Sequence, residues 1–130
     1  MYYTFNIKTP SRTAMIEITS KVQEIVEQSG VKAGVCTVFI PHTTAGVTIN
    51  ENADSDVVDD ILKELNKIVP FSDNYAHVEG NSAAHIKASL IGSSVQVIIE
   101  DGRLVLGTWQ GIYFCEFDGP RSRKVYVKII

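Results

Sequence analysis

The three histidines are the residues of this chain whose types and spacing most suggest chemistry. His77 and His85 lie eight positions apart, and His42 follows a predicted strand, next to two threonines. Neutral imidazole is the commonest metal ligand in proteins, and three histidines can hold a metal that keeps one position open for water or substrate. His42, His77 and His85 are therefore candidate catalytic residues and a candidate metal site. The alternative interpretation is separate turn or surface histidines, each bonded to a backbone carbonyl.

A helix start lies between His77 and His85 in the sequence. Asn81 or Ser82 is predicted to cap a short helix, SAAHIKASLIG. Free N–H groups at a helix N-terminus can bind an anion, which makes Asn81 and Ser82 candidate phosphate-binding residues. A loop that folds back over this start would bring the two histidines within reach of one ion or anion.

Polar residues within or beside predicted strands form a second set of candidates. Asn50 and Glu51 end a strand, and Glu51 could orient a histidine or accept a hydrogen bond from a substrate amine. Gln110 and Glu116 share one face of a later strand, and Trp109 lies on the opposite face. Because an unpaired buried carboxylate is costly, Glu116 needs either solvent or a partner. The ordinary alternatives are turn chemistry and, for the lone tryptophan, a place in the core.

The densest basic group of the chain follows a predicted turn. Asp118-Gly119-Pro120 precedes Arg121, Arg123 and Lys124. A guanidinium group after a tight turn suits bidentate phosphate binding, which makes Arg121 a candidate phosphate ligand. Charges that protect an edge strand are the alternative interpretation.

These candidates must be positioned by a mixed set of elements. Helices are predicted near 19–29, 54–67 and 82–91 from apolar spacing and capping residues. The first two strand-like runs, YYTFNIKT and TAMIEI, are predicted to form a hairpin, and Asp101-Gly102 indicates another. The expected fold is α+β, with a sandwich-like antiparallel β-sheet system and about three helices.

Length and composition limit the class of protein. A chain of 130 residues with 45% hydrophobic and 21% charged residues is expected to form one globular domain, 1–130. Its formal net charge of −3 gives no overall attraction to nucleic acid or to an anionic membrane. No stretch shows aromatic residues interleaved with basic ones on one face. Without a signal peptide or an apolar run of spanning length, the protein is expected to be cytoplasmic.

Three long motifs in order resemble the YjbQ-like family, also called the secondary thiamine-phosphate synthase family: HTTAGVTINEN (42–52), HVEGNSAAHIKASLIGSS (77–94) and GTWQGIYFCEFDGPRSRKV (107–125). The resemblance implies a compact α+β domain that forms a homotrimer, with motif residues gathered in clefts at or near subunit boundaries. The polar set implied for this chain is His42, Asn50, Glu51, His77, Asn81, His85, Trp109, Gln110, Glu116, Asp118 and Arg121.

The reaction implied by the resemblance joins a hydroxymethylpyrimidine diphosphate to a thiazole phosphate and releases diphosphate. A divalent metal (Zn²⁺ or Mg²⁺), the helix start and Arg121 would stabilise the diphosphate, and Glu51, Glu116 or Gln110 would bind the pyrimidine amine. Trp109 and Asp118 join the substrate-binding candidates. Two alternatives stay open: a metal-dependent hydrolase that uses a histidine-bound water, and a protein that binds a small anion or metabolite without turnover.

Overall fold

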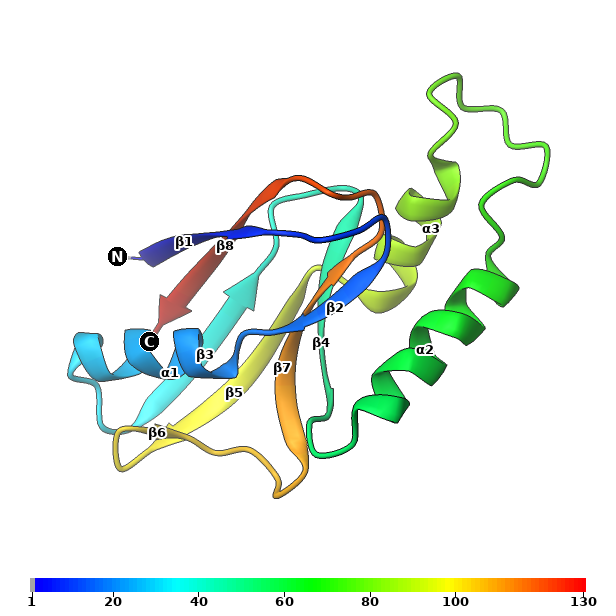
Figure 1. Cartoon of the computed structure of the whole chain (residues 1–130). Helices are drawn as coiled ribbons and strands as arrows, with labels where there is room; N and C mark the ends of the chain where they lie inside the picture. The colour runs from blue at the N-terminus through cyan, green and yellow to red at the C-terminus, as the bar shows by residue number, and fades with distance from the viewer. Residues whose placement is uncertain (1) are drawn as a thin grey trace.

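Residues 2–130, which the computed structural model describes, form two antiparallel sheets and three helices (Figure 1). The five-stranded sheet has the order β1-β8-β3-β5-β6, and the three-stranded sheet has the order β2-β7-β4. The strands are β1 Tyr2–Lys8, β2 Ala14–Glu17, β3 Gly34–Phe39, β4 Ala45–Glu51, β5 Ser94–Glu100, β6 Arg103–Leu104, β7 Gln110–Glu116 and β8 Ser122–Ile129; the helices are α1 Thr19–Ser29, α2 Ser55–Ile68 and α3 Ser82–Ile91. The predicted α+β class and its antiparallel sheets are confirmed.

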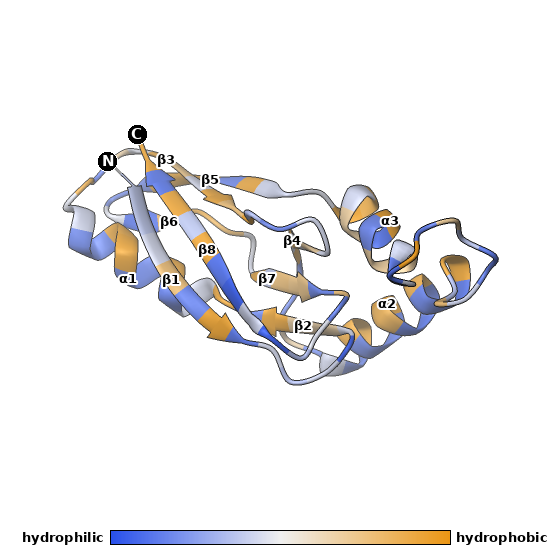
Figure 2. Cartoon of the chain, turned by 90° about the horizontal axis from the view of Figure 1, so that it is seen from above, coloured by the Kyte–Doolittle hydropathy of each residue, from blue (hydrophilic) through white to orange (hydrophobic). Residues whose placement is uncertain are grey.

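Alternation along the strands gives the five-stranded sheet one buried and one outer face. In β8, Val125 and Val127 are fully buried, whereas Lys124 and Lys128 are exposed. Figure 2 shows this as a change between hydrophilic and hydrophobic colours along β1 and β8. Helix α1 packs its buried residues against the inward side, so the main core lies between this helix and the two sheets.

The predicted hairpin between the first two strands is wrong. β1 pairs with β8 in the large sheet, and β2 pairs with β7 in the small one. The connecting segment bonds to a distant turn: Thr9 N–H donates to Arg121 O, and Gly119 N–H donates to Arg12 O. These long-range bonds carry the chain from one sheet to the other. The second predicted hairpin is present, with Glu100 opposite Arg103.

Helix α2 lies beside the small sheet, and the loop 69–81 extends beyond it (Figure 1). Asp54 caps the helix by accepting from Asp56 N–H at 2.9 Å. Its apolar stripe is only partly covered, since none of its residues is buried. Val58 and Leu65 pack against a small second core that includes α3 and β7. No helix within residues 2–130 combines the length and the apolar character that crossing a membrane requires.

The small sheet sets the distance between the candidate residues. β4 and β7 run antiparallel, with Ala45 opposite Glu116 at one end and Glu51 opposite Gln110 at the other. At about 3.3 Å per residue, these two ends are roughly 20 Å apart. Residues at opposite ends of this strand pair cannot contact the same small ligand within one protomer.

Candidate functional site

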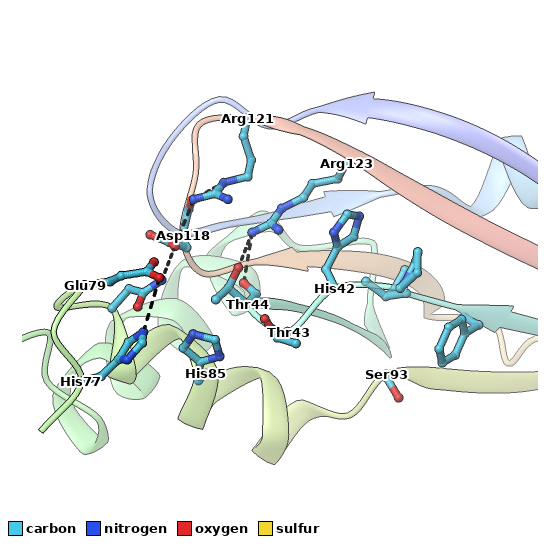
Figure 3. A pocket seen from close by; sticks show the side chains of 14 residues that line it. His42, Thr43, Thr44, His77, Glu79, His85, Ser93, Asp118, Arg121 and Arg123 are labelled. Atoms are coloured by element: carbon cyan, nitrogen blue, oxygen red, sulfur yellow. Dashed lines mark hydrogen bonds and ion pairs between the residues drawn. The ribbon is translucent and has the colours of Figure 1, made fainter. Parts of the chain in front are cut away.

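Four segments of the chain bring predicted site residues to a cavity of about 760 Å³ (Figure 3). The segments are the β3–β4 loop, the loop before α3, the start of α3, and the turn between β7 and β8. Six of the predicted site residues line this cavity: His42, His77, Asn81, His85, Asp118 and Arg121. Figure 3 shows His77 and His85 on one side, with His42 and Arg121 across from them.

His77 and His85 form one wall of the cavity. Their ring centroids are 5.6 Å apart in an edge-to-face arrangement, and Nε2 of His77 lies 4.0 Å from a carboxylate oxygen of Glu79. The end of α3 approaches β4 closely, because a Cβ added at Gly46 would lie 2.5 Å from Gly92 O. Only glycine at position 46 allows this close approach. The approach holds α3, and with it His85, against the three-stranded sheet.

His42 is anchored to the first residues of β8. Its Nε2 accepts a hydrogen bond from Lys124 N–H at 2.9 Å, so this nitrogen carries no proton and the neutral ring holds its proton on Nδ1. Burial and the positive charge of Arg123 lower the pKa of His42 below its ordinary value, which favours the neutral form. Within residues 2–130, Asn81 Oδ1 is the one buried side-chain polar atom without a partner. The Nδ1–H of His42 also has no protein partner but is not among these buried atoms, so it must be accessible to solvent.

The predicted three-histidine metal site is not formed in the protomer. Across residues 2–130, no three His, Cys, Asp or Glu side chains are placed to hold one metal ion. His42 cannot supply Nε2, because its lone pair already accepts from Lys124 N–H. This leaves His77 and His85 as neighbouring imidazoles with no third histidine ligand.

Asn81 acts differently from the prediction. Its side chain does not cap α3; its Nδ2 donates to Asp118 Oδ2 at 2.9 Å. The carboxylate can only accept, so it orients the amide nitrogen toward itself and leaves the amide oxygen on the other side. The second N–H of this amide has no protein partner, so its availability for an anion stays a prediction. Asn81 therefore positions Asp118, and Ser82 does not line the cavity.

Arg121 presents a partly free guanidinium to the cavity. Its Nη2 donates to Asp118 Oδ2 at 3.0 Å and its Nε donates to Asp118 O at 2.9 Å. These two bonds orient the group and leave three of its five N–H donors available. The Arg121 side chain is half exposed. Its position fits the predicted role as an anion ligand.

Glu116, predicted as a catalytic residue, is a structural carboxylate. It is fully buried and accepts from Thr9 Oγ1, from two backbone N–H groups, and from both Nε and Nη2 of Arg123. Burial opposes its ionisation, but the hydrogen bonds from Arg123, Asp118 N–H and Thr9 outweigh this and lower its pKa below its ordinary value. All of its acceptor positions are used, so none remains for a substrate.

Arg123 and Thr44 were not predicted as site residues. Arg123 is 3% exposed and donates to Thr44 Oγ1 at 2.8 Å as well as to Glu116, and both residues line the cavity. Arg123 belongs to the basic group after the turn, and Thr44 follows His42 by two residues. The signal that could have identified Arg123 was the need of Glu116 for a buried partner.

The remaining predicted residues lie at the far end of the small sheet. Asn50, Glu51 and Gln110 occupy the ends of β4 and β7 away from the cavity, and Trp109 directly precedes β7. Glu51 Oε2 accepts from Ala53 N–H, and Gln110 Oε1 accepts from Gly107 N–H, so both acceptors serve local turns. Trp109 is 63% exposed and is not a core anchor. Within one protomer these four residues do not join the histidine cavity.

Comparison with known proteins places this chain in a family. The family model described as UPF0047 protein YjbQ-like matches residues 3–130. The chain belongs to the UPF0047 YjbQ-like family. The YjbQ-like protein YugU of Bacillus subtilis is 51% identical over 131 residues, covering 100% of this chain and 99% of that protein. MJ1081 of Methanocaldococcus jannaschii is 52% identical over 130 residues, covering 100% of this chain and 94% of that protein.

Solved structures of the YjbQ-like family share the same fold. A crystal structure of a yjbq/upf0047 family protein from Clostridium acetobutylicum has a TM-score of 0.97 and 62% sequence identity, and the match covers 98% of this chain and 99% of that one. A YbjQ-like protein from Sulfolobus solfataricus retains a TM-score of 0.95 at 33% identity, over 99% of this chain and 95% of that one. The resemblance predicted from the three motifs is confirmed.

Proposed function

We propose that this YjbQ-like protein is an enzyme that acts on phosphorylated small molecules, with activity of the secondary thiamine-phosphate synthase type. It would join a hydroxymethylpyrimidine diphosphate to a thiazole phosphate and release diphosphate. The observation that carries the proposal is the convergence of His42, His77, His85 and Arg121 on one cavity. These side chains bring N–H donors from four segments of the chain to a space large enough for a diphosphate.

The chemistry of this reaction needs anion stabilisation more than proton transfer. The C–O bond between the pyrimidine methylene and the diphosphate breaks, and the diphosphate leaves with the electron pair. The lone pair of the thiazole nitrogen then forms the new C–N bond. That nitrogen carries no proton to lose, so no general base is required. The main task is to stabilise negative charge on the departing diphosphate with donors already in place.

Particular donors of the cavity suit this task. Arg121 has three free N–H groups and a fixed orientation on Asp118. His42 presents Nδ1–H because its other nitrogen is occupied. The proposed step relies on these protein donors.

Arg121→Ala tests the anion site. Diphosphate at a hundred times its Kd should stabilise the wild-type protein by about 2.7 kcal/mol through mass action. We expect Arg121→Ala to lose most of this protection, because the remaining donors lack a guanidinium, and to lose turnover of the two phosphorylated substrates. The measurements are thermal melts with and without diphosphate and an assay of released diphosphate. Arg103→Ala, an exposed arginine on β6 away from the cavity, is the control.

Two outcomes would count against the proposal. Equal diphosphate protection in Arg121→Ala and Arg103→Ala would show that Arg121 does not bind the anion. Normal protection of the wild-type protein without any thiamine phosphate formed would instead favour a protein that binds the anion without turnover.

A homotrimer is part of the same proposal. Large apolar side chains on and beside α2 and α3 are open to solvent in the protomer: Ile68 is 64% exposed, Val78 99% and Leu90 62%. Exposed apolar surface of this kind is typical of an interface between chains. We expect light scattering at micromolar concentration to give three times the chain mass of 14.3 kDa. A monomeric mass would contradict the trimer.

A further inference from the structure

A second cavity, of about 510 Å³, lies on the outer face of the five-stranded sheet where β1 meets β8. Asn6, Lys8, His42, Ser122 and Lys124 line it. No acidic residue belongs to its lining, in contrast to the first cavity, which includes Glu79 and Asp118. Apart from His42, the residues of this second cavity were not predicted as a site.

Strand register explains how the polar groups gather there. Lys8 lies opposite Ser122, and Asn6 lies opposite Lys124, so alternation places all four side chains on the same outer face. All four are exposed. Lys8 and Lys124 are diagonal neighbours on the two strands. Residues in this arrangement are typically about 7–8 Å apart, a distance that long side chains can bridge. One anion can therefore contact both ammonium groups, with amide and hydroxyl donors beside them.

The positive charge of this second cavity is uncompensated by the protein. Within residues 2–130, neither Lys8 nor Lys124 forms an ion pair. Arg123, which also lines the cavity, is already neutralised by Glu116. Two exposed lysines at such a diagonal repel one another weakly in water, and an anion between them removes this repulsion. The chain as a whole is acidic, with a net charge of −3, so the basic character is local.

His42 connects the two cavities, since it lines both of them. The hydrogen bond from Lys124 N–H holds the His42 ring between the two cavities, and the Lys124 side chain lines the second cavity. Arg123 also lines both cavities, so His42 and Arg123 together lie between a ligand in the second cavity and the diphosphate site.

Aromatic rings continue the same outer face. Tyr126 follows Lys124 by two positions, and its ring lies 5.3 Å from that of Tyr2 and 6.3 Å from that of Phe39. A flat organic group next to a phosphate in the second cavity would have an aromatic surface to pack against. This face alternates basic and aromatic residues along β8, an arrangement that the sequence analysis did not find.

We propose that the second cavity binds a phosphate monoester that carries a flat ring, with the phosphate between Lys8 and Lys124 and the ring toward Tyr126. This identification rests on the proposed function: the ligand is the second reactant, the phosphorylated nucleophile. It reaches the first cavity past His42. The first cavity then binds the diphosphate, and each reactant has its own cationic site.

The double variant Lys8→Ala/Lys124→Ala tests the site, with phenyl phosphate as the probe in calorimetric titration. We expect its binding to weaken at least tenfold, while diphosphate still protects the variant against heating. The matched control is Lys21→Ala/Lys32→Ala, which removes two exposed lysines elsewhere.

Tyr126→Leu tests the place of the ring. This variant should bind phenyl phosphate more weakly and bind inorganic phosphate as the wild-type protein does. In turnover, the KM for the thiazole phosphate should rise without change in the KM for the diphosphate substrate.

Several results would overturn this second site: no phenyl phosphate binding by the wild-type protein, equal binding by the double variant and its control, or equal loss of both ligands in the double variant. Tighter binding of a single-stranded oligonucleotide, lost with the two lysines, would assign the face to nucleic acid instead. Lysine-dependent phenyl phosphate binding without any Arg121-dependent effect of diphosphate would support the site and reject the proposed function.

Discussion

Glu116→Ala is expected to lower the free energy of unfolding by about 3–5 kcal/mol, the range for removing one partner of a buried ion pair. The loss is large because Arg123, 3% exposed, would keep its charge without its carboxylate partner. Asp118 N–H would also lose its acceptor, whereas Thr9 Oγ1 and Phe117 N–H would keep Arg121 O and Thr44 O as acceptors. Urea denaturation at a fixed protein concentration measures the change, since oligomer stability depends on concentration.

The control for this change is Glu79→Ala, because the Glu79 side chain is 75% exposed. Its effect should stay within about ±0.5 kcal/mol. A double variant, Glu116→Leu/Arg123→Met, removes both charges and should recover much of the stability, because replacing a whole buried pair is often close to neutral. A loss in Glu116→Ala no larger than that in Glu79→Ala would contradict the structural role.

The same carboxylate gives stability a defined pH dependence. The folded-state pKa of Glu116 is lowered, so its contribution is fully present above the unfolded value of about 4.3 and disappears as the pH falls through the folded value. The wild-type advantage over Glu116→Ala should therefore be constant near neutral pH and shrink in acid. An advantage that grows as the pH falls below 4 would show the opposite sign.

Two substitutions of His42 should separate its two nitrogens, with a large effect on turnover. The asparagine amide nitrogen is attached to Cγ, as Nδ1 is, so His42→Asn retains a donor toward the cavity. Glutamine places its oxygen two bonds beyond Cγ, as Nε2 is, so His42→Gln retains the acceptor for Lys124 N–H. We expect turnover to fall about 10²–10³-fold in His42→Gln, the range for loss of one donor to a developing anion. His42→Asn should retain more activity.

Stability should change in the opposite order. His42→Asn loses the bond from Lys124 N–H, a cost of about 0.5–1.5 kcal/mol, whereas His42→Gln should melt close to the wild-type protein. Turnover, thermal melting and metal content would be measured on each variant, on protein purified without a histidine tag. Equal loss of turnover in both variants, together with loss of a bound metal, would show instead that His42 is a metal ligand.

Short-range patterns in the sequence predicted the elements of this fold well. The apolar spacing of Val22, Ile25 and Val26 predicted α1, and the alternation in β8 is already visible in KVYVKII. Capping and turn residues such as Asp54 and Asp101-Gly102 marked where elements begin and turn. These signals depend on neighbours within a few residues, which the sequence states directly. The histidine motifs likewise indicated the cavity, because residues at turns and helix starts lie at the ends of elements.

Only the tertiary structure decided which distant groups meet. β1 and β2 resemble a hairpin locally, yet each pairs with a strand from the last quarter of the chain. His42 accepts from a backbone N–H 82 residues away. That bond, absent from any local pattern, takes Nε2 away from metal binding. The partner of Glu116 was equally undetermined until the turn between β7 and β8 brought Arg123 back to Glu116, with Thr9 and Thr44 beside them.

The division of the predicted site has the same cause. Glu51 and Glu116 both lie at strand ends in motifs of the family, and the sequence offers no reason to separate them. Because β4 and β7 are antiparallel, the end of one strand lies beside the start of the other, so Glu51 meets Gln110 while Glu116 meets Ala45. Strand direction and register arise from packing between segments distant in the chain. Local propensity cannot specify strand direction and register. These two properties determine which side chains share a cavity.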